Sequence, residues 1–168
     1  QKPVNKKDYV LYFGRYSLEK GIATLVQVAR ELPQIPFVFA GSGPLEHLLE
    51  GVPNIKNVGF QSGEALETLI REARFTVLPS EWYENCPFSV LESISLGTPV
   101  LGASIGGIPE LIQLGQTGEV FDAHNADAMK GKIVQLFAAD SARYTKQCMA
   151  SCFETVETYC EELVRYYA

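Results

Sequence analysis

Short apolar runs alternate with amphipathic segments along most of this chain, and that alternation limits its fold more than any other feature. Residues 9–13 are apolar throughout, as is typical of a strand covered on both faces of a parallel sheet. Residues 22–32 then place apolar side chains at helical spacing up to Pro33, which ends a helix because its ring cannot continue one. The first two elements are therefore predicted to be a strand and a helix.

The same alternation continues toward the carboxyl end. It predicts strands at residues 37–40, 55–60, 75–78, 100–103 and 119–121, helices at residues 64–73, 88–96 and 126–138, and a short helix from Pro109. Elements that alternate in this way form a parallel sheet with right-handed crossovers and helices on both faces. We therefore predict an α/β, Rossmann-like fold with three layers, α/β/α, whose central layer is a parallel sheet of about six strands.

Ligands of such folds bind beyond the carboxyl ends of the strands. A site is therefore expected in the loops that begin at Gly14, Gly41, Gln61, Pro79 and Ser104. None of these positions is the aspartate that a phosphoacceptor domain would need. A G-x-G-x-x-G sequence after the first strand, which would indicate a nicotinamide cofactor, is absent as well.

Composition excludes several classes of function. A length of 168 residues with 46% apolar residues suits one compact unit. The formal net charge of −6 argues against general affinity for nucleic acid or anionic membranes, so an anionic ligand would need local positive charge. No apolar run approaches the ~20 residues that span a bilayer, and the first residues lack a signal-peptide pattern. We expect a soluble, cytoplasmic protein.

The two ends of the chain differ from its centre. Residues 1–8 are polar and precede the first strand, so they are predicted to be a linker from a missing N-terminal domain, with residues 9–150 forming the α/β domain. The pattern is helical after residue 139. In residues 151–168 an apolar stripe either covers the sheet or packs on the missing domain, which would leave Tyr159, Leu163, Tyr166 and Tyr167 partly exposed in this chain.

The cysteines do not suggest a structural framework. Cys86, Cys148, Cys152 and Cys160 form no paired C-x-x-C units, and the chain has only two histidines that could join them as metal ligands. We therefore expect reduced cysteines and no metal site.

Two cations follow the first predicted strand, in Gly14-Arg15-Tyr-Ser-Leu-Glu-Lys20-Gly21. A glycine at this turn lets a ligand approach the backbone, and an arginine fork with a lysine point charge can clamp a diphosphate. The alternative is that Arg15 and Lys20 are solvated surface charges.

Two glycine pairs stand at other strand ends. Gly41 and Gly43 follow the second predicted strand, and Gly106 and Gly107 precede Pro109 at the start of a short helix. Each pair is a candidate phosphate loop or rim of the site. Each is also compatible with an ordinary turn or helix start that has no ligand.

The sequence Glu84-Asn-Cys-Pro-Phe-Ser-Val-Leu-Glu92 places one acid in a loop and a second acid in the second turn of a helix. Pro87 suits the first helical turn and Gly97 the end of the helix. Glu92 is expected to lie either on a solvated stripe or half-buried against a hydrogen-bond donor. Vicinal ribose hydroxyls would be such donors, since they can give one carboxylate two hydrogen bonds.

In order, the motifs are Gly14-Arg15-x-x-x-Glu19-Lys20-Gly21, Gly41-x-Gly43-Pro44, Val58-Gly59-Phe60, Pro79-Ser80, Glu84-x7-Glu92, Gly97-x-Pro99-Val100 and Gly106-Gly107-Ile108-Pro109-Glu110. This series resembles the donor-binding, C-terminal domain of the GT-B glycosyltransferases of family four, which are retaining enzymes. The resemblance covers nearly the whole chain. The family's N-terminal acceptor domain has no counterpart in it.

The resemblance implies a role for each matching residue. Arg15, Lys20 and Glu84 would be catalytic: the two cations hold the diphosphate as charge builds on the leaving group, and Glu84 contacts the donor sugar. Glu92 would hold the ribose. The residues implied to bind the nucleotide sugar are Gly14, Gly59, Phe60, Gln61, Asn85, Cys86, Pro87, Phe88 and Glu92, with Gly59 to Gln61 near the base.

One segment departs from the family pattern. Many members have Gly-Phe-Gly after the first glutamate, whereas this chain has Asn85-Cys86-Pro87. Proline has no N–H to donate, so contacts to the donor sugar are expected to differ.

The implied function is hexose transfer from a UDP- or GDP-linked donor to an acceptor hydroxyl of a glycan or glycolipid, without a metal or other cofactor. The missing domain would supply the acceptor site, and the full-length enzyme would lie at the inner face of the membrane. We expect the fragment alone to be inactive. The alternatives are half of a nucleotide-sugar epimerase of the same architecture and a non-catalytic nucleotide-binding or assembly module.

Overall fold

The computed structural model describes residues 5–151 and Val164, and its centre is a six-stranded parallel sheet. The strands are β1 Val10–Arg15, β2 Phe37–Ser42, β3 Ile55–Asn57, β4 Phe75–Leu78, β5 Val100–Ala103 and β6 Gly118–Phe121. They lie in the order β3-β2-β1-β4-β5-β6, and every pairing is parallel. The predicted α/β fold is confirmed.

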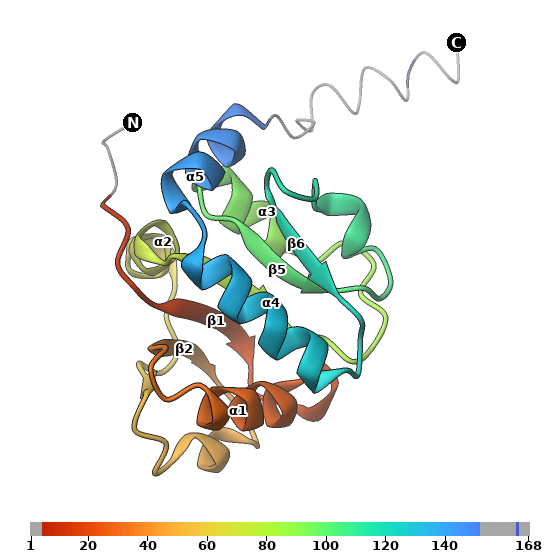
Figure 1. Cartoon of the computed structure of the whole chain (residues 1–168). Coiled ribbons are helices and arrows are strands. Elements are labelled where there is room, and N and C mark those ends of the chain that lie inside the picture. The colour runs from red at the N-terminus through yellow and green to blue at the C-terminus, as the bar shows by residue number, and fades with distance from the viewer. Residues whose placement is uncertain (1–4, 152–163, 165–168) are drawn as a thin grey trace.

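Helices cover both faces of this sheet. The α-helices are α1 Ile22–Glu31, α2 Gly63–Glu72, α3 Phe88–Ser95, α4 Ala126–Ala138 and α5 Ser141–Ala150, and the 3₁₀ turns are η1 Leu18–Lys20, η2 Glu46–Leu49 and η3 Pro109–Leu111. In Figure 1, α1 and α4 lie in front of the sheet, and α2 and α3 lie behind it. The molecule therefore has the three predicted layers.

The alternating side chains of the strands explain the two covered faces. Val10 and Tyr12 of β1 belong to the same buried cluster as Leu25 of α1 and Ile133 of α4. Leu11, between them in sequence, packs on the opposite face. Successive residues of a strand point to opposite faces, and a strand that is apolar at every position is therefore buried on both.

β1 is longer than predicted. The prediction that Gly14 ends this strand is wrong, because Gly14 and Arg15 continue the ladder by pairing with Gly41 and Ser42 of β2. A Cβ atom on Gly41 would overlap the carbonyl oxygen of Gly14. The two glycines allow the strands to run on side by side to the edge where the loops begin.

β3 is shorter than predicted. It ends at Asn57 rather than at residue 60, although Val58 N–H still donates to Phe39 O at 2.9 Å. Gly59 has φ +70°, a left-handed conformation that turns the chain out of the strand. The segment implied to line the base therefore lies in a loop.

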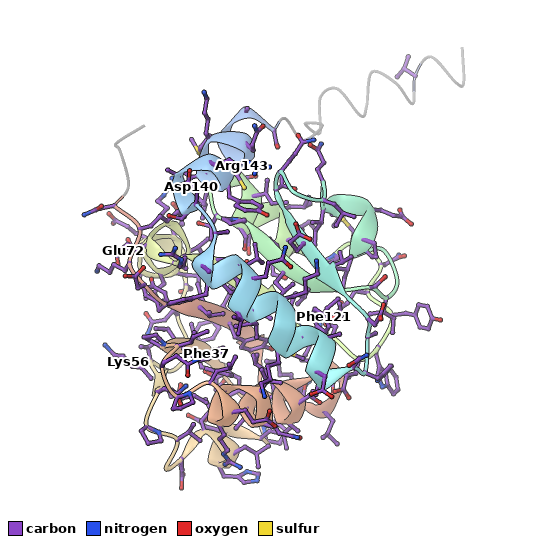
Figure 2. The ribbon with its side chains drawn as sticks, in the orientation of Figure 1. Phe37, Lys56, Glu72, Phe121, Asp140 and Arg143 are labelled. Carbon is purple, nitrogen blue, oxygen red and sulfur yellow. The ribbon has the colours of Figure 1, made fainter. Side chains whose placement is uncertain are left out.

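Hydrogen bonds and an ion pair fix residues near both ends of the range 5–151. Lys6 Nζ donates to Thr98 Oγ1 at 2.6 Å, and Asp8 pairs with Arg74 at 2.6 Å. At the other end, Asp140 caps α5 by accepting hydrogen bonds from Ala142 N–H and Arg143 N–H, and Figure 2 labels Asp140 and Arg143 at this helix.

The predicted exposed stripe at Tyr159, Leu163, Tyr166 and Tyr167 lies outside the described residues. Within the described ranges, no helix has the length and apolar content needed to cross a bilayer.

The contact between Gly41 and Gly14 yields a stability prediction. Gly41→Ala should lower the free energy of unfolding by more than about 2 kcal/mol, because a buried side chain without space forces the backbone apart. Urea unfolding followed by circular dichroism measures this change.

Gly131→Ala is the matched control. Gly131 lies inside α4 with no neighbour near its would-be Cβ atom, so this substitution should stabilise by about 0.5–1 kcal/mol. Equal effects of the two substitutions would contradict the packing argument.

Candidate functional site

The site is centred where the order of the strands changes direction. β1 is paired with β2 on one side and with β4 on the other, so the chain leaves β1 toward one edge of the sheet and later returns to the opposite side. Open parallel sheets bind ligands beyond the carboxyl ends of their strands, at such a switch point. Lys20 follows β1, and Glu84 follows β4.

These two side chains meet. The Lys20 ammonium bonds to Glu84 Oε1, with 32% of the lysine and 20% of the glutamate side chain exposed. The same carboxylate oxygen accepts a hydrogen bond from the Ser80 hydroxyl at 2.9 Å. Two of the three predicted catalytic residues are therefore brought into direct contact.

Further contacts hold the β1 and β4 loops against each other. Glu81 N–H donates to Glu19 O at 2.9 Å, and the Thr24 hydroxyl donates to the Glu81 carboxylate at 2.6 Å. A Cβ atom on Gly21 would overlap the carbonyl oxygen of Pro79. Lys20 and Glu84 thus lie on two loops joined by main-chain and side-chain contacts.

Glu19 has a further partner within its own loop. The Ser17 hydroxyl donates to Glu19 Oε1 at 2.6 Å. This hydrogen bond is the main cause that lowers the pKa of the Glu19 carboxyl, since a donor favours the charged form. Glu19 therefore adds negative charge beside Lys20.

A third loop supports Glu84 from the other side. Gly107 N–H donates to the carbonyl oxygen of Glu84 at 2.7 Å. Side chains at Gly106 or Gly107 would overlap the backbone of Glu84 or Asn85 respectively. The glycine pair therefore packs directly under the loop that carries Glu84.

Arg15 is the last residue of β1 and lies on the wall of a cleft of about 420 Å³. The cleft is lined by Phe13, Gly14, Arg15, Ala40, Gly41, Ser42, Gly43, Pro44, Phe60, Gln61 and Leu66. Six of the predicted site residues are therefore gathered around one hollow. Gly59 adjoins it, since its carbonyl oxygen accepts from Gly41 N–H at 2.9 Å.

Glu92 lies in a neighbouring hollow of about 350 Å³ with Gly63, Glu67 and Ser95. Leu66 lines both hollows, so they adjoin. Glu92 is exposed and belongs to none of the ion pairs in the described part of the chain. Of the two predicted environments for this acid, the structure has the solvated one.

The loop after Glu84 presents its side chains to solvent. Asn85 and Cys86 are exposed, and 75% of Phe88 is exposed, whereas Pro87 is buried directly before α3. Pro87 therefore precedes the helix rather than occupying its first turn.

Sequence reasoning missed Tyr12, which holds the main chain of Arg15 in place. The Tyr12 side chain is only 1% exposed, and its hydroxyl donates to Arg15 O at 2.8 Å. A Cβ atom on Gly14 would lie 3.2 Å from this hydroxyl. Burial raises the pKa of Tyr12, with smaller contributions from Tyr16, Glu84 and Glu19. Sequence analysis did not single out Tyr12 because it lies in an apolar run, although a tyrosine near the end of a central strand could have indicated its role.

A larger cavity, of about 640 Å³, lies near the opposite ends of the strands. It is lined in part by Tyr9, Phe37, Lys56 and Glu72, and Figure 2 labels the last three on one side of the molecule. The smaller cleft is the candidate ligand site, since parallel sheets of this kind bind ligands at carboxyl ends. Among residues 5–151 and Val164, no group of three histidine, cysteine or acidic side chains could hold a metal ion.

Comparison with known proteins identifies the family. The sequence profile described as "Glycosyl transferases group 1" matches residues 1–147. The chain belongs to this family of glycosyl transferases. It is 36% identical over 124 residues to sulfoquinovosyl transferase SQD2 of Arabidopsis thaliana, which covers 70% of this chain and 24% of that protein. It is 28% identical over 171 residues to a GDP-mannose-dependent alpha-mannosyltransferase of Corynebacterium glutamicum, covering 99% of this chain and 41% of that protein.

Solved structures of GT-B glycosyltransferases confirm the Rossmann-like α/β fold of this chain. TarM of S. aureus, solved in complex with UDP and other ligands, superposes with a TM-score of 0.84 at 21% identity, over 98% of this chain and 36% of that one. HepE of Anabaena, solved with UDP, superposes with a TM-score of 0.74 at 20% identity, over 87% and 43% of the two chains. The chain thus spans less than half the length of each of these relatives.

The Tyr12 hydroxyl gives a pH-dependent prediction. Tyr12→Phe should lower the free energy of unfolding at pH 7 by about 1 kcal/mol, through loss of the hydrogen bond to Arg15 O. Because the folded-state pKa of Tyr12 is raised, the wild type loses stability as pH rises above the unfolded value of about 10. The phenylalanine variant lacks that loss, so the difference between the two proteins should shrink above pH 10. Urea titrations at pH 7, 9, 10 and 11 measure it, and a constant difference would contradict the burial of this hydroxyl.

Proposed function

We propose that the chain is the nucleotide-sugar-binding half of a retaining, metal-independent glycosyltransferase that moves a hexose from a UDP- or GDP-linked donor to an acceptor hydroxyl. The observation that carries this proposal is the contact between Lys20 and Glu84 at the switch point of the sheet, beside the cleft that Arg15 lines. Membership of the group 1 glycosyl transferases supports it. The product would be a surface glycan or glycolipid.

The diphosphate is assigned to Arg15 and Lys20. In a chain whose net charge is −6, these two cations supply local positive charge at the carboxyl edge. Arg15 belongs to none of the ion pairs among the described residues, and its guanidinium can bind two phosphate oxygens at once. Lys20 has three donors, so it can bond to a phosphate oxygen while it remains near Glu84.

The two hollows suit the other parts of a nucleotide sugar. A base against Phe60 and Gln61 would place its ribose near Leu66, where the first hollow meets the one that contains Glu92. The exposed Glu92 carboxylate can accept two hydrogen bonds from vicinal hydroxyls. Glu84 would contact the hexose beyond the diphosphate.

The proposed reaction needs charge stabilisation at one bond. The acceptor oxygen forms a bond to the anomeric carbon as the bond from that carbon to the diphosphate oxygen breaks, and the departing diphosphate oxygen takes up the acceptor proton. The sugar passes through an oxocarbenium-like state. Negative charge gathers on the leaving group, where Arg15 and Lys20 stabilise it more strongly than in the ground state.

The full protein is needed for turnover. The chain spans 24% and 41% of the two curated relatives described above, and we propose that the acceptor site lies on the remainder. This chain alone should bind the donor weakly and transfer nothing. The relatives are named for different sugars, sulfoquinovose and mannose among them.

Binding of nucleotides tests the proposal. Calorimetry with UDP, GDP and ADP should detect weak binding of UDP or GDP, and Glu92→Ala should weaken it about tenfold, as expected for loss of hydrogen bonds to a charged group. The 2′-deoxy form should bind less well than the ribonucleotide to the wild type. That preference should shrink in Glu92→Ala.

Glu67→Ala is the matched control, because Glu67 lines the same hollow and pairs with Arg71 one helical turn away. It should bind nucleotide within about twofold of the wild type. If none of the three nucleotides binds at millimolar concentration, the proposed function is wrong. An equal loss in both variants would remove the ribose role of Glu92.

Alkylation of Cys86 gives an independent test. Cys86 is exposed two residues beyond Glu84, so a bound nucleotide sugar should slow its reaction with iodoacetamide, as measured by peptide mass spectrometry. Cys148 is the internal control. It is buried, and burial raises the pKa of its thiol to about 12, so it should react slowly with or without ligand. Unchanged labelling of Cys86 at a ligand concentration that saturates calorimetry would place the sugar away from this loop.

A further inference from the structure

The Ser80 side chain is fully buried, at 0% exposure, immediately after β4. Its hydroxyl donates to Glu84 Oε1 at 2.9 Å, the oxygen that also receives the Lys20 ammonium. No hydrogen bond within the described ranges uses Glu84 Oε2. One carboxylate oxygen is therefore held by the protein, and the other is available to a ligand.

The two donors on Glu84 Oε1 differ in how firmly they are placed. Ser80 has one side-chain torsion and lies between Pro79, which packs on Gly21, and Glu81, whose N–H and carboxylate are both bonded. Lys20 has a long flexible side chain that is 32% exposed. A buried short side chain loses little freedom when it makes a hydrogen bond, whereas an ordered lysine loses much more.

The main chain of Glu84 is fixed separately. Gly107 N–H donates to its carbonyl oxygen at 2.7 Å, so the backbone position does not depend on Ser80. What Ser80 adds is the direction of the carboxylate. Removal of the hydroxyl would therefore change the side chain of Glu84 more than it changes the loop.

We propose that Ser80 is a positioning residue that holds the Glu84 carboxylate toward the donor sugar while Lys20 is shared with the diphosphate. This inference rests on the proposed function and deepens it. When a diphosphate attracts the lysine, the ammonium is drawn by two anions at once, and any movement toward the diphosphate weakens its attraction for Glu84. The hydroxyl of Ser80 then remains as the neutral donor that keeps Oε1 in place and Oε2 directed at the sugar.

The test separates recognition of the sugar from recognition of the nucleotide. Wild type, Ser80→Ala and Ser93→Ala are titrated with UDP, UDP-glucose, GDP and GDP-mannose, and saturation-transfer NMR compares the sugar protons with the base protons of the bound donor. Ser93 is an equally buried serine that bonds to Thr76 and to Ser89 O, away from Glu84. It controls for the loss of a buried hydroxyl.

Ser80→Ala should keep UDP or GDP affinity within twofold and lower the sugar-to-base saturation ratio about threefold or more, since one hydrogen bond to a charged group orients the carboxylate. Ser93→Ala should leave the ratio unchanged. A purely structural role would instead lower thermal stability and weaken nucleotide and nucleotide-sugar binding together.

Several outcomes would overturn the proposal. A saturation ratio in Ser80→Ala equal to that of the wild type does so, as does an equal loss in Ser93→Ala. If Ser80→Ala does not fold, Ser80→Cys carries the comparison, because it keeps the size of the side chain but donates only weakly. Wild-type protein that binds no nucleotide overturns the proposed function itself. Nucleotide binding with an unaffected sugar ratio overturns only the role of Ser80.

Discussion

The parallel pairing of β1 with both β2 and β4 is the constraint on which the site depends. Val10 pairs with Phe37 on one side and with Phe75 on the other, so segments distant in sequence flank one central strand. Their carboxyl ends then share an edge, and the loops after β1 and β4 meet there. Contact between those loops requires a residue without a side chain at Gly21. Lys20 and Glu84 therefore meet because of both the order of the strands and the close packing of the two loops.

The junction carries both signs of charge, because Arg15 and Lys20 lie near Glu19 and Glu84. The chain is acidic overall, yet Arg15 and Lys20 lie at the same edge. Glu84 partly neutralises Lys20 at a position where neither side chain is fully buried, so the ion pair contributes little to stability. A doubly charged diphosphate competes well for such a lysine, because it brings more charge to the same place. A role in the proposed ligand binding therefore explains the pair better than a role in folding does.

Sequence alone predicted the layers, most element positions and the loops that matter, because periods of two and of three to four residues record burial directly. β4, β5 and α4 begin and end where predicted. Strand register was not predicted, because Gly14 was expected at a turn, whereas it pairs with Gly41 in the sheet. Ser80 was part of a motif but received no role, and Tyr12 was not singled out, because a buried hydroxyl acquires its role from partners that only the folded chain brings near. The environment of Glu92 stayed open for the same reason.

In the loop from Glu84 to Pro87, the path of the main chain and the chemistry of the side chains depend on different residues. Gly106 and Gly107 hold its main chain from the β5 side, through a hydrogen bond and a close contact that involve only backbone atoms. Replacement of side chains in the loop therefore leaves its path largely unchanged. The donors change nonetheless, since Pro87 removes an N–H and Asn85 and Cys86 are exposed to solvent. A loop whose path is fixed from outside can change its side chains without altering the fold, so the likeness to the family establishes the architecture and does not identify the proposed hexose.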